Sequence, residues 1–455
     1  MADKWRNDVL LINSFRPKSL CLNFALPNKM KPTQVNPVRR ILIASLIGTT
    51  IEFFDFYIYA TAAVLVFPKL FFPSGNSNAA TLESLGTFAL AFLARPIGAV
   101  IFGHFGDRKG RKATLVAALM TMGPSTVAIG LLPGYASIGI FAPILLAVFR
   151  FGQGLGLGGE WGGAVLLATE HAPQGKKAWY GMFPQLGAPI GFLFSSGIFL
   201  LLSKNLSDQQ FISFGWRIPF IASALLVWVG LYVRLKIAET PDFIKIIEKD
   251  ERVKVPFAEV FLKHTKAIVL GTFATITTFL LFYLMTVFTI SWGTTKFHYT
   301  RTGFLVAQMI SMLFFAIGIP LSAVMADKFG RGKILITVTI LIFAYGLVFE
   351  PLFVPGNWLL TVAFLALGMF LMGLTYGPTG TTLAGIFPAS VRYTGSSLAF
   401  TLAGIIGASP APLVATKLAS IYHMSYVGYY LSFAALITLL ALIAVRGKLT
   451  ESESK

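Results

Sequence analysis

The chain has 455 residues, of which 55% are hydrophobic and 12% are charged, and its mean hydropathy is +0.74. Soluble domains carry about a quarter charged residues, so this composition excludes a soluble enzyme or scaffold. A single cysteine excludes a disulfide framework and a cysteine-based metal cluster. The net charge of +18 has two possible meanings, nucleic-acid binding or membrane topology, and its distribution along the chain decides between them.

Twelve apolar runs follow one another, each about as long as the 20 residues that a helix needs to cross a bilayer. Proline, glycine or charged residues separate them. The predicted fold class is therefore an all-α membrane protein with twelve transmembrane helices. We expect these helices near residues 41–66, 80–104, 113–132, 138–168, 179–202, 216–235, 267–292, 303–326, 334–351, 358–385, 395–419 and 425–445.

The predicted helices divide into two six-helix bundles at a polar segment, residues 237–266. Within it, Thr240, Pro241 and Asp242 fit the start of a helix. An apolar face follows them, so we predict an amphipathic surface helix that bridges the bundles. The bundles are expected at residues 40–236 and 267–446, with tails at 1–39 and 447–455.

Basic residues are concentrated before the first run, after the second, between the bundles and after the last run. Lys and Arg are retained on the cytoplasmic side, so both tails are predicted to be cytoplasmic, in the inner (plasma) membrane. The basic charge thus reports topology and not a nucleic-acid partner. The amino-terminal tail lacks the continuous apolar core of a signal peptide, and Met30 is an alternative to Met1 as the start of the chain.

Ionisable residues inside the predicted helices are few and gather in the amino-terminal half. Each costs roughly 2.5–3.5 kcal/mol to place in a bilayer, so we expect functional roles for them. Glu52 and Asp55 share one face of the first helix with Tyr59, and we expect this face to look into a central cavity. Arg95 lies in the second helix.

The fourth predicted helix carries Arg150, Gln153 and Glu160 in a glycine-rich run. No strand precedes this run, which argues against a dinucleotide-binding loop. Glycines four residues apart, such as Gly154 and Gly158, instead favour close packing of two membrane helices.

Three acids stand against two arginines in this set, which leaves one carboxylate without a cationic partner. Such a carboxylate can take up a proton in a poorly solvated cavity. We predict that the acids couple proton movement and that the arginines bind substrate; the alternative is that all of them only tie helices together. The predicted proton-coupling residues are Glu52, Asp55 and Glu160, and the predicted substrate contacts are Arg95, Arg150, Gln153, Tyr59, Tyr283 and Tyr376.

A charged turn after the second helix recurs after the eighth. Two halves with the same turn indicate a duplicated transporter with its site between the halves. The first copy contains Asp107, Arg108, Gly110, Arg111 and Lys112, and the second contains Asp327 and Arg331, each 220 residues after its counterpart.

With these motifs, the sequence resembles the major facilitator superfamily and, within it, the metabolite:proton symporter family. The superfamily pattern is the turn after the second helix, preceded by Gly103. Relatives in this family move shikimate, 2-oxoglutarate, citrate, proline or betaine. The matching segments at family level are residues 52–56, 95–98, 154–163, 215–220, 239–241 and 387–395.

The resemblance implies alternating access, with substrate bound between the halves near the middle of the membrane. It also implies that Asp107 meets the positive end of the eleventh helix near Thr394 and closes the cytoplasmic side. Arg108 and Arg111 would anchor the same contact. The second copy has Ala323 where the first has Gly103, so we expect a weaker contact there.

We expect a proton-coupled symporter of a small polar metabolite, with an organic acid favoured. A proline/betaine-type osmolyte symporter, or a uniporter or antiporter of an organic acid, are the open alternatives. The five histidines are scattered, so neither a metal site nor an enzyme is expected, and no cofactor. The expected partners are the substrate, protons and the lipid bilayer, and the expected functional unit is a monomer.

Overall fold

The computed structural model describes residues 38–72, 77–250 and 252–454. Within these ranges, eleven helices are long and apolar enough to cross a membrane, and the all-α membrane fold is thereby confirmed. Most of the tail predicted at residues 1–39 lies outside the described part.

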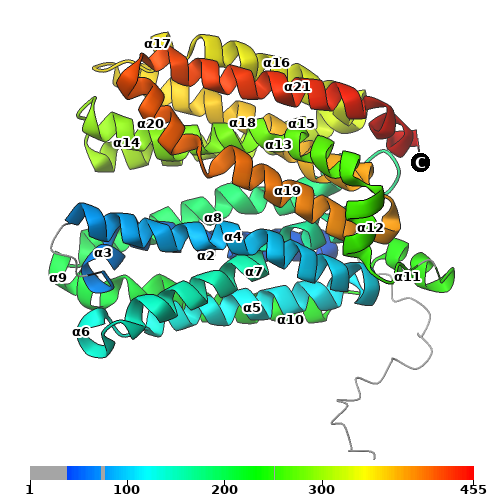
Figure 1. Cartoon of the computed structure of the whole chain (residues 1–455), viewed down its shortest axis with the longest axis horizontal. Coiled ribbons are helices and arrows are strands. Elements are labelled where there is room, and N and C mark those ends of the chain that lie inside the picture. The colour runs from blue at the N-terminus through cyan, green and yellow to red at the C-terminus, as the bar shows by residue number, and fades with distance from the viewer. Residues whose placement is uncertain (1–37, 73–76, 251, 455) are drawn as a thin grey trace, which may run out of the picture. The chain divides into compact units, whose positions relative to one another are not determined.

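The helices of the amino-terminal half lie side by side in Figure 1. The long ones are α2 (Val38–Leu65), α4 (Ser77–Lys109), α5 (Arg111–Leu131), α7 (Phe141–Thr169), α8 (Lys177–Asn205) and α10 (Arg217–Leu235). Short helices between them are α3 (Phe67–Leu70), α6 (Tyr135–Ile138), α9 (Asp208–Gln210) and η2 (Phe211–Gly215).

The carboxyl-terminal half repeats this arrangement with more breaks. Its helices are α13 (Thr265–Tyr283), η3 (Leu284–Phe288), α14 (Thr289–Thr295), α15 (Arg301–Phe329), α16 (Arg331–Leu347), α17 (Phe349–Leu352), α18 (Trp358–Ile386), η4 (Ala389–Val391), α19 (Arg392–Ala408), α20 (Ala411–Ile421) and α21 (Met424–Ser454). The helix α21 continues through most of the predicted carboxyl-terminal tail.

One predicted spanning helix, near 334–351, is divided between α16 and α17. The helix α16 has 17 residues and ends at Leu347. Pro351 accounts for this end, because a proline ring clashes with the carbonyl group four residues before it. The helix expected near 395–419 is similarly divided into α19 and α20 around Pro410.

The segment between the halves contains two short helices, α11 (Pro241–Glu248) and α12 (Pro256–Lys263). As predicted, α11 begins at Pro241 directly after Thr240, and it buries Phe243 and Ile246. The helix α12 was not predicted.

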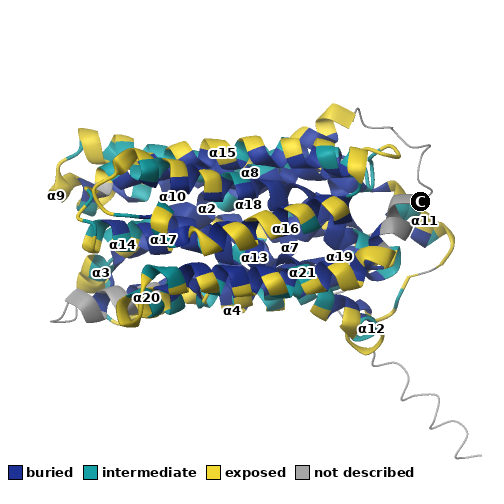
Figure 2. Ribbon diagram, turned by 90° about the horizontal axis from the view of Figure 1, so that it is seen from above, coloured by how far each residue is buried: buried dark blue, intermediate teal, exposed yellow. Residues whose placement is uncertain are grey.

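The two halves meet mainly along two helix pairs, α4 with α19 and α15 with α8. Inside the amino-terminal half, α7 approaches α4 so closely that a Cβ atom on Gly158 would overlap the carbonyl oxygen of Arg95. The close packing predicted for the glycine-rich run is therefore present. Figure 2 shows buried residues in the interior and exposed ones on the outer faces, where large apolar side chains such as Leu225 and Trp228 suit a lipid environment.

Candidate functional site

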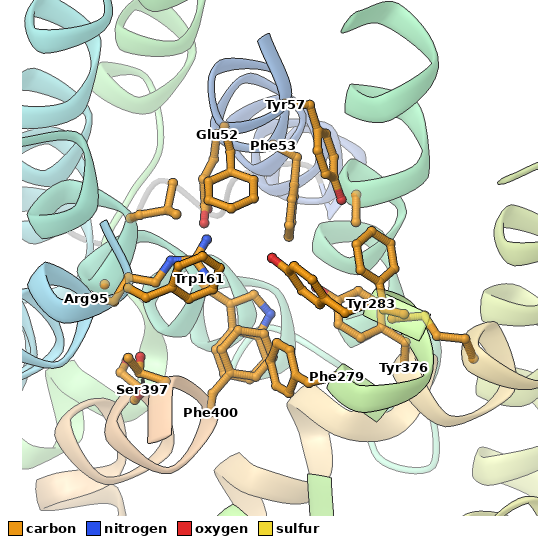
Figure 3. A pocket seen from close by; sticks show the side chains of 18 of the residues that line it. Glu52, Phe53, Tyr57, Arg95, Trp161, Phe279, Tyr283, Tyr376, Ser397 and Phe400 are labelled. Atoms are coloured by element: carbon orange, nitrogen blue, oxygen red, sulfur yellow. Dashed lines mark hydrogen bonds between the residues drawn. The ribbon is translucent and has the colours of Figure 1, made fainter. Parts of the chain in front are cut away.

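A small cavity of about 50 Å³ lies between the halves, and side chains from both halves line it (Figure 3). In water, about 30 Å³ belongs to each molecule, so this volume is far too small for a metabolite. Substrate binding therefore requires the lining to move. The polar and aromatic lining includes Glu52 from α2, Arg95 from α4, Trp161 from α7, Tyr283 from α13, Tyr376 from α18 and Phe400 from α19.

Glu52 and Arg95 are the charged groups of this central cavity, and in Figure 3 their side chains point toward each other. Within the described part of the chain, Oε2 of Glu52 and Nε of Arg95 are buried without a hydrogen-bond partner. The Arg95 guanidinium lies 4.8 Å from the Phe56 ring centre and 5.2 Å from that of Phe92. Cation–π contacts of this kind hold the charge and leave hydrogen-bonding capacity for a ligand.

Aromatic side chains form most of the remaining lining. The Trp161 ring lies parallel to the Phe400 ring, with centroids 3.5 Å apart, so α7 of one half contacts α19 of the other. Trp161 Nε1 donates to Oε1 of Gln185 at 2.8 Å, and Gln185 Nε2 donates to the carbonyl of Tyr376 at 2.8 Å. These bonds hold Trp161 in place between the halves.

Asp55 does not line this cavity and belongs to a second buried cluster inside the amino-terminal half. Its carboxylate accepts hydrogen bonds from Ser223 at 2.6 Å and Thr126 at 2.9 Å. Gln153 Nε2 donates to the Thr126 hydroxyl at 2.7 Å, and Arg150 Nη1 donates to Gln153 Oε1 at 2.9 Å. A chain of hydrogen bonds thus joins Asp55 to Arg150.

Arg150 is fully buried in an aromatic cage. Its guanidinium lies 3.8 Å from the Tyr59 ring centre, 4.9 Å from that of Phe88 and 5.0 Å from that of Phe56. Its Nε and Nη2 atoms have no hydrogen-bond partner among the described residues. Phe56 therefore contacts both buried guanidinium groups, Arg95 at the cavity and Arg150 in the inner cluster.

The expectation that Glu52 and Asp55 face one cavity is wrong, because they point into different clusters. Of the predicted substrate contacts, Arg95, Tyr283 and Tyr376 line the central cavity. The others, Arg150, Gln153 and Tyr59, surround the Asp55 cluster instead.

Glu160 forms a buried ion pair with Arg234, near the end of α10, which was not counted among the arginines inside the predicted helices. Arg234 Nη1 also donates to the carbonyl of Leu115 at 2.9 Å. The count of two arginines for three acids is therefore wrong, since Arg234 is a third. Its position within an apolar run, before Leu235, is the sequence signal that was missed.

Asp107, at the end of α4, contacts the first turn of α19 in the other half. Its carboxylate accepts from the backbone N–H of Tyr393 at 3.1 Å, the N–H of Thr394 at 2.9 Å and the Thr394 hydroxyl at 2.8 Å. Arg111 Nη1 donates to the same carboxylate at 3.2 Å. Arg108 is exposed, so the expectation that it shares the anchoring is wrong.

A Cβ atom on Gly103 would lie 2.7 Å from Thr394 Cα, so the close approach of α4 and α19 requires glycine there. Gly110 adopts φ +116°, which lets the chain turn sharply from α4 into α5. In the next turn, the backbone N–H groups of Arg111 and Lys112 donate to the carboxylate of Glu239.

Further charges extend this contact. Arg111 Nη2 lies 3.6 Å from Glu170 Oε1, and Arg392 Nη1 lies 3.4 Å from the same atom. Arg392 Nη1 also bonds Asp242 of α11 at 3.0 Å. The network joins α5, α7, α11 and α19, and its members Glu170, Asp242 and Arg392 were not predicted as site residues.

Asp327 makes the equivalent contact from the carboxyl-terminal half. Its carboxylate accepts from the N–H groups of Ala178 at 2.8 Å and Trp179 at 2.9 Å, in the first turn of α8. Arg331 Nη1 donates to the carbonyl of Thr381 at 2.6 Å. The two halves are thus fastened twice at the end of the molecule that carries α11.

Comparison with known proteins agrees with this architecture. Residues 41–267 match the family model described as sugar (and other) transporter. The chain is 55% identical to the inner membrane metabolite transport protein YhjE of Escherichia coli K12, over 92% of this chain and 96% of that protein. It is 33% identical to the shikimate transporter of the same organism, over 90% of this chain and 94% of that protein.

Among solved structures, the proton:xylose symporter XylE of the major facilitator superfamily, bound to 6-bromo-6-deoxy-D-glucose, matches with a TM-score of 0.71. The sequence identity is 17%, and the match covers 90% of this chain and 95% of that chain, so it concerns the fold. The near full-length identity to YhjE shows the family. The chain belongs to the metabolite transporters of the major facilitator superfamily, which are membrane transporters and not enzymes.

Proposed function

We propose that the chain is a proton-coupled symporter that imports a small organic acid across the inner membrane. The observation that carries this proposal is the partnerless buried oxygen of Glu52 opposite Arg95 in a cavity lined by both halves. Arg95 would bind the substrate carboxylate. Two carboxylates beside one guanidinium repel each other, so a proton on Glu52 favours the entry of an anionic substrate.

Phe56 lies between this cavity and the Asp55 cluster, so it can transmit a movement of side chains from one to the other. It contacts Arg95 at 4.8 Å on one side and Arg150 at 5.0 Å on the other. When Arg95 turns toward a substrate, Phe56 and then Arg150 would shift, and the hydrogen-bond chain to Asp55 would respond. Asp55 is therefore the second candidate for proton carrier.

The contacts of Asp107 and Asp327 would close the side from which substrate leaves. Basic residues are concentrated at that end, which supports assigning it to the cytoplasm. Release of substrate requires both contacts to break so that the halves separate there. The predicted division into bundles at residues 40–236 and 267–446, working as one monomer, fits this alternating access.

A second candidate substrate class is a zwitterion with a quaternary ammonium group. The aromatic lining of the central cavity suits such a cation, and an ionised Glu52 would add a negative charge. A relative in Salmonella typhimurium is named a proline/betaine transporter. A uniporter or an antiporter would use the same cavity, and proton movement separates these modes from symport.

The test begins with a thermal-shift screen of organic acids and betaines on the purified transporter. With the compound that binds best, Glu52→Gln should keep counterflow exchange but lose accumulation driven by a pH gradient. Asp55→Asn is the matched variant from the inner cluster. If proton-driven accumulation survives in Glu52→Gln and is lost in Asp55→Asn, the proton carrier is Asp55 and not Glu52. Accumulation that survives in both variants would contradict the proposal.

A further inference from the structure

A second polar cavity, of about 140 Å³, lies between the halves at the end where Asp107 and Asp327 make their contacts. We call it the closing-end cavity. It shares no lining residue with the central cavity. Its polar lining is Thr169 from α7, Lys177 from α8, Asp242 from α11, Arg331 from α16, Thr381 from α18 and Arg392 from α19.

Positive charge exceeds negative charge in this lining, since Lys177, Arg331 and Arg392 stand against Asp242. Asp242 already bonds Arg392. The Lys177 side chain, which is partly buried, makes no hydrogen bond or ion pair with any residue that the structure describes. The cavity therefore holds a half-buried ammonium group that a ligand can pair.

An adjoining cleft of about 480 Å³ increases the positive potential. It shares Lys177 and Arg331 with the closing-end cavity and adds three cations, Lys328, Lys333 and Arg446, and one acid, Asp327. A concave surface in which one sign of charge prevails concentrates ions of the opposite sign. Anions are therefore drawn to this end of the molecule.

We propose that the closing-end cavity binds a small anion with a carboxylate or phosphate group, and that the bound anion holds the two halves closed. Its volume is roughly that of four or five water molecules, which suits an ion the size of inorganic phosphate. The anion would link Lys177 of the amino-terminal half to Arg331 and Arg392 of the carboxyl-terminal half.

This arrangement makes binding depend on conformation. When the halves separate at this end, Lys177 moves away from the two arginines, so the anion binds the closed state more tightly than the open one. A ligand shifts an equilibrium by its difference in affinity for the two states. The anion thus slows opening, and its concentration on that side of the membrane sets the rate of substrate release.

The test uses the purified full chain in phosphatidylcholine nanodiscs and inorganic phosphate as the probe. The thermal midpoint is measured against phosphate concentration at constant ionic strength, with chloride as the balancing anion. We expect a saturable rise for the wild type and for Lys177→Arg. In Lys177→Gln the apparent affinity should fall about tenfold or more. The neighbouring Lys176→Gln, which does not line the cavity, should behave as the wild type.

Free anions and lipid headgroups can both supply a phosphate group, and a second experiment distinguishes between them. In nanodiscs containing phosphatidylglycerol, a Lys177-dependent rise of the midpoint without phosphate, together with loss of the phosphate response, would identify the headgroup as occupant. A phosphate response unchanged by this lipid would identify the free anion. No saturable response in either bilayer, or an equal response in Lys177→Gln, would overturn the proposal, and neither result depends on which substrate is transported.

Discussion

The two halves of the chain repeat one closing contact but differ in the chemistry behind it. Asp107 bonds the start of α19, and Asp327 bonds the start of α8, each through two backbone N–H groups. Behind Asp107, the amino-terminal half contains buried carboxylates and guanidinium groups, whereas the carboxyl-terminal half offers tyrosines and phenylalanines to the central cavity. The two halves thus share this contact, whereas the charged groups that line the central cavity come from the amino-terminal half.

The two contacts also differ in the residue four positions before the aspartate. Gly103 allows α4 to touch the backbone of Thr394, and Ala323 occupies the equivalent position on α15. The expected weakness of the second contact is not visible in its backbone bonds, which are 2.8 and 2.9 Å long. We expect the halves to differ in function as they do in charge.

The largest expected effect separates the charged half from the aromatic half. Arg95→Ala removes the guanidinium that faces Glu52, and losing a buried charged partner costs about 2–5 kcal/mol, so substrate affinity should fall more than tenfold. Tyr283→Phe, on the opposite wall, should change affinity only a few-fold. Isothermal titration of both variants checks this. Equal losses would show that the two halves contribute equally to binding.

Removing the closing carboxylates should open the molecule unequally. Asp107→Ala removes the acceptor of three hydrogen bonds from the other half, and a hydrogen bond to a charged group contributes about 1.5–3 kcal/mol to the closed state. We expect a smaller effect from Asp327→Ala, because Asp107 also accepts a side-chain hydrogen bond from the other half, from the Thr394 hydroxyl. The measurement is labelling of Ser397→Cys, in the central cavity, by an impermeant maleimide in inside-out vesicles, with Cys21→Ser as background. Faster labelling in Asp327→Ala than in Asp107→Ala would show that the Asp327 contact contributes more to closure.

Substitutions at Gly103 and Ala323 test the same difference between the Asp107 and Asp327 contacts. Gly103→Ala places a methyl group 2.7 Å from Thr394 Cα, and overpacking of this kind costs about 1–3 kcal/mol. Ala323→Gly removes a methyl group and should cost less than about 1.5 kcal/mol. The same labelling experiment should therefore show opening in Gly103→Ala and little change in Ala323→Gly. If Gly103→Ala left the labelling rate unchanged, the close contact between α4 and α19 would not be needed for closure.

The smallest expected effect is a pH dependence at Glu239, outside the spanning helices. Burial raises the pKa of Glu239, and hydrogen bonds from Thr240, Arg111 and Lys112 counter this only in part. A carboxyl whose pKa is higher in the folded state stabilises the fold at low pH and loses that contribution as pH rises through the folded pKa. The thermal midpoint of the wild type relative to Glu239→Gln should therefore fall as pH rises above about 4.5. The exposed Glu248→Gln is the control, and a difference that grows with pH would contradict the sign.

The fold was predictable because its signals are local. Runs of apolar residues mark the spanning helices, and the order Thr240, Pro241 marks the start of α11. The repeated turn predicted the contact of Asp107 with α19 through a family resemblance. The division of α16 from α17 was missed because the apolar run continues through it, although Pro351 was the available signal.

The pairing of buried charges was not predictable in the same way. Sequence spacing places Glu52 and Asp55 on one broad face, but rotation and packing of α2 send them to different neighbours. Glu160 pairs with Arg234, which is 74 residues away and lies at the end of another helix. Such partners depend on how helices are arranged in three dimensions, and one sequence contains no record of that arrangement.

The central claim is that a proton crosses the membrane with the substrate through the Glu52 cavity. The most direct measurement is the external pH of lightly buffered, de-energised cells that make the transporter, after addition of the substrate found by the screen. We predict alkalinisation with the wild type and none with Glu52→Gln. Substrate uptake by the wild type with no pH change, or with acidification, would contradict proton symport.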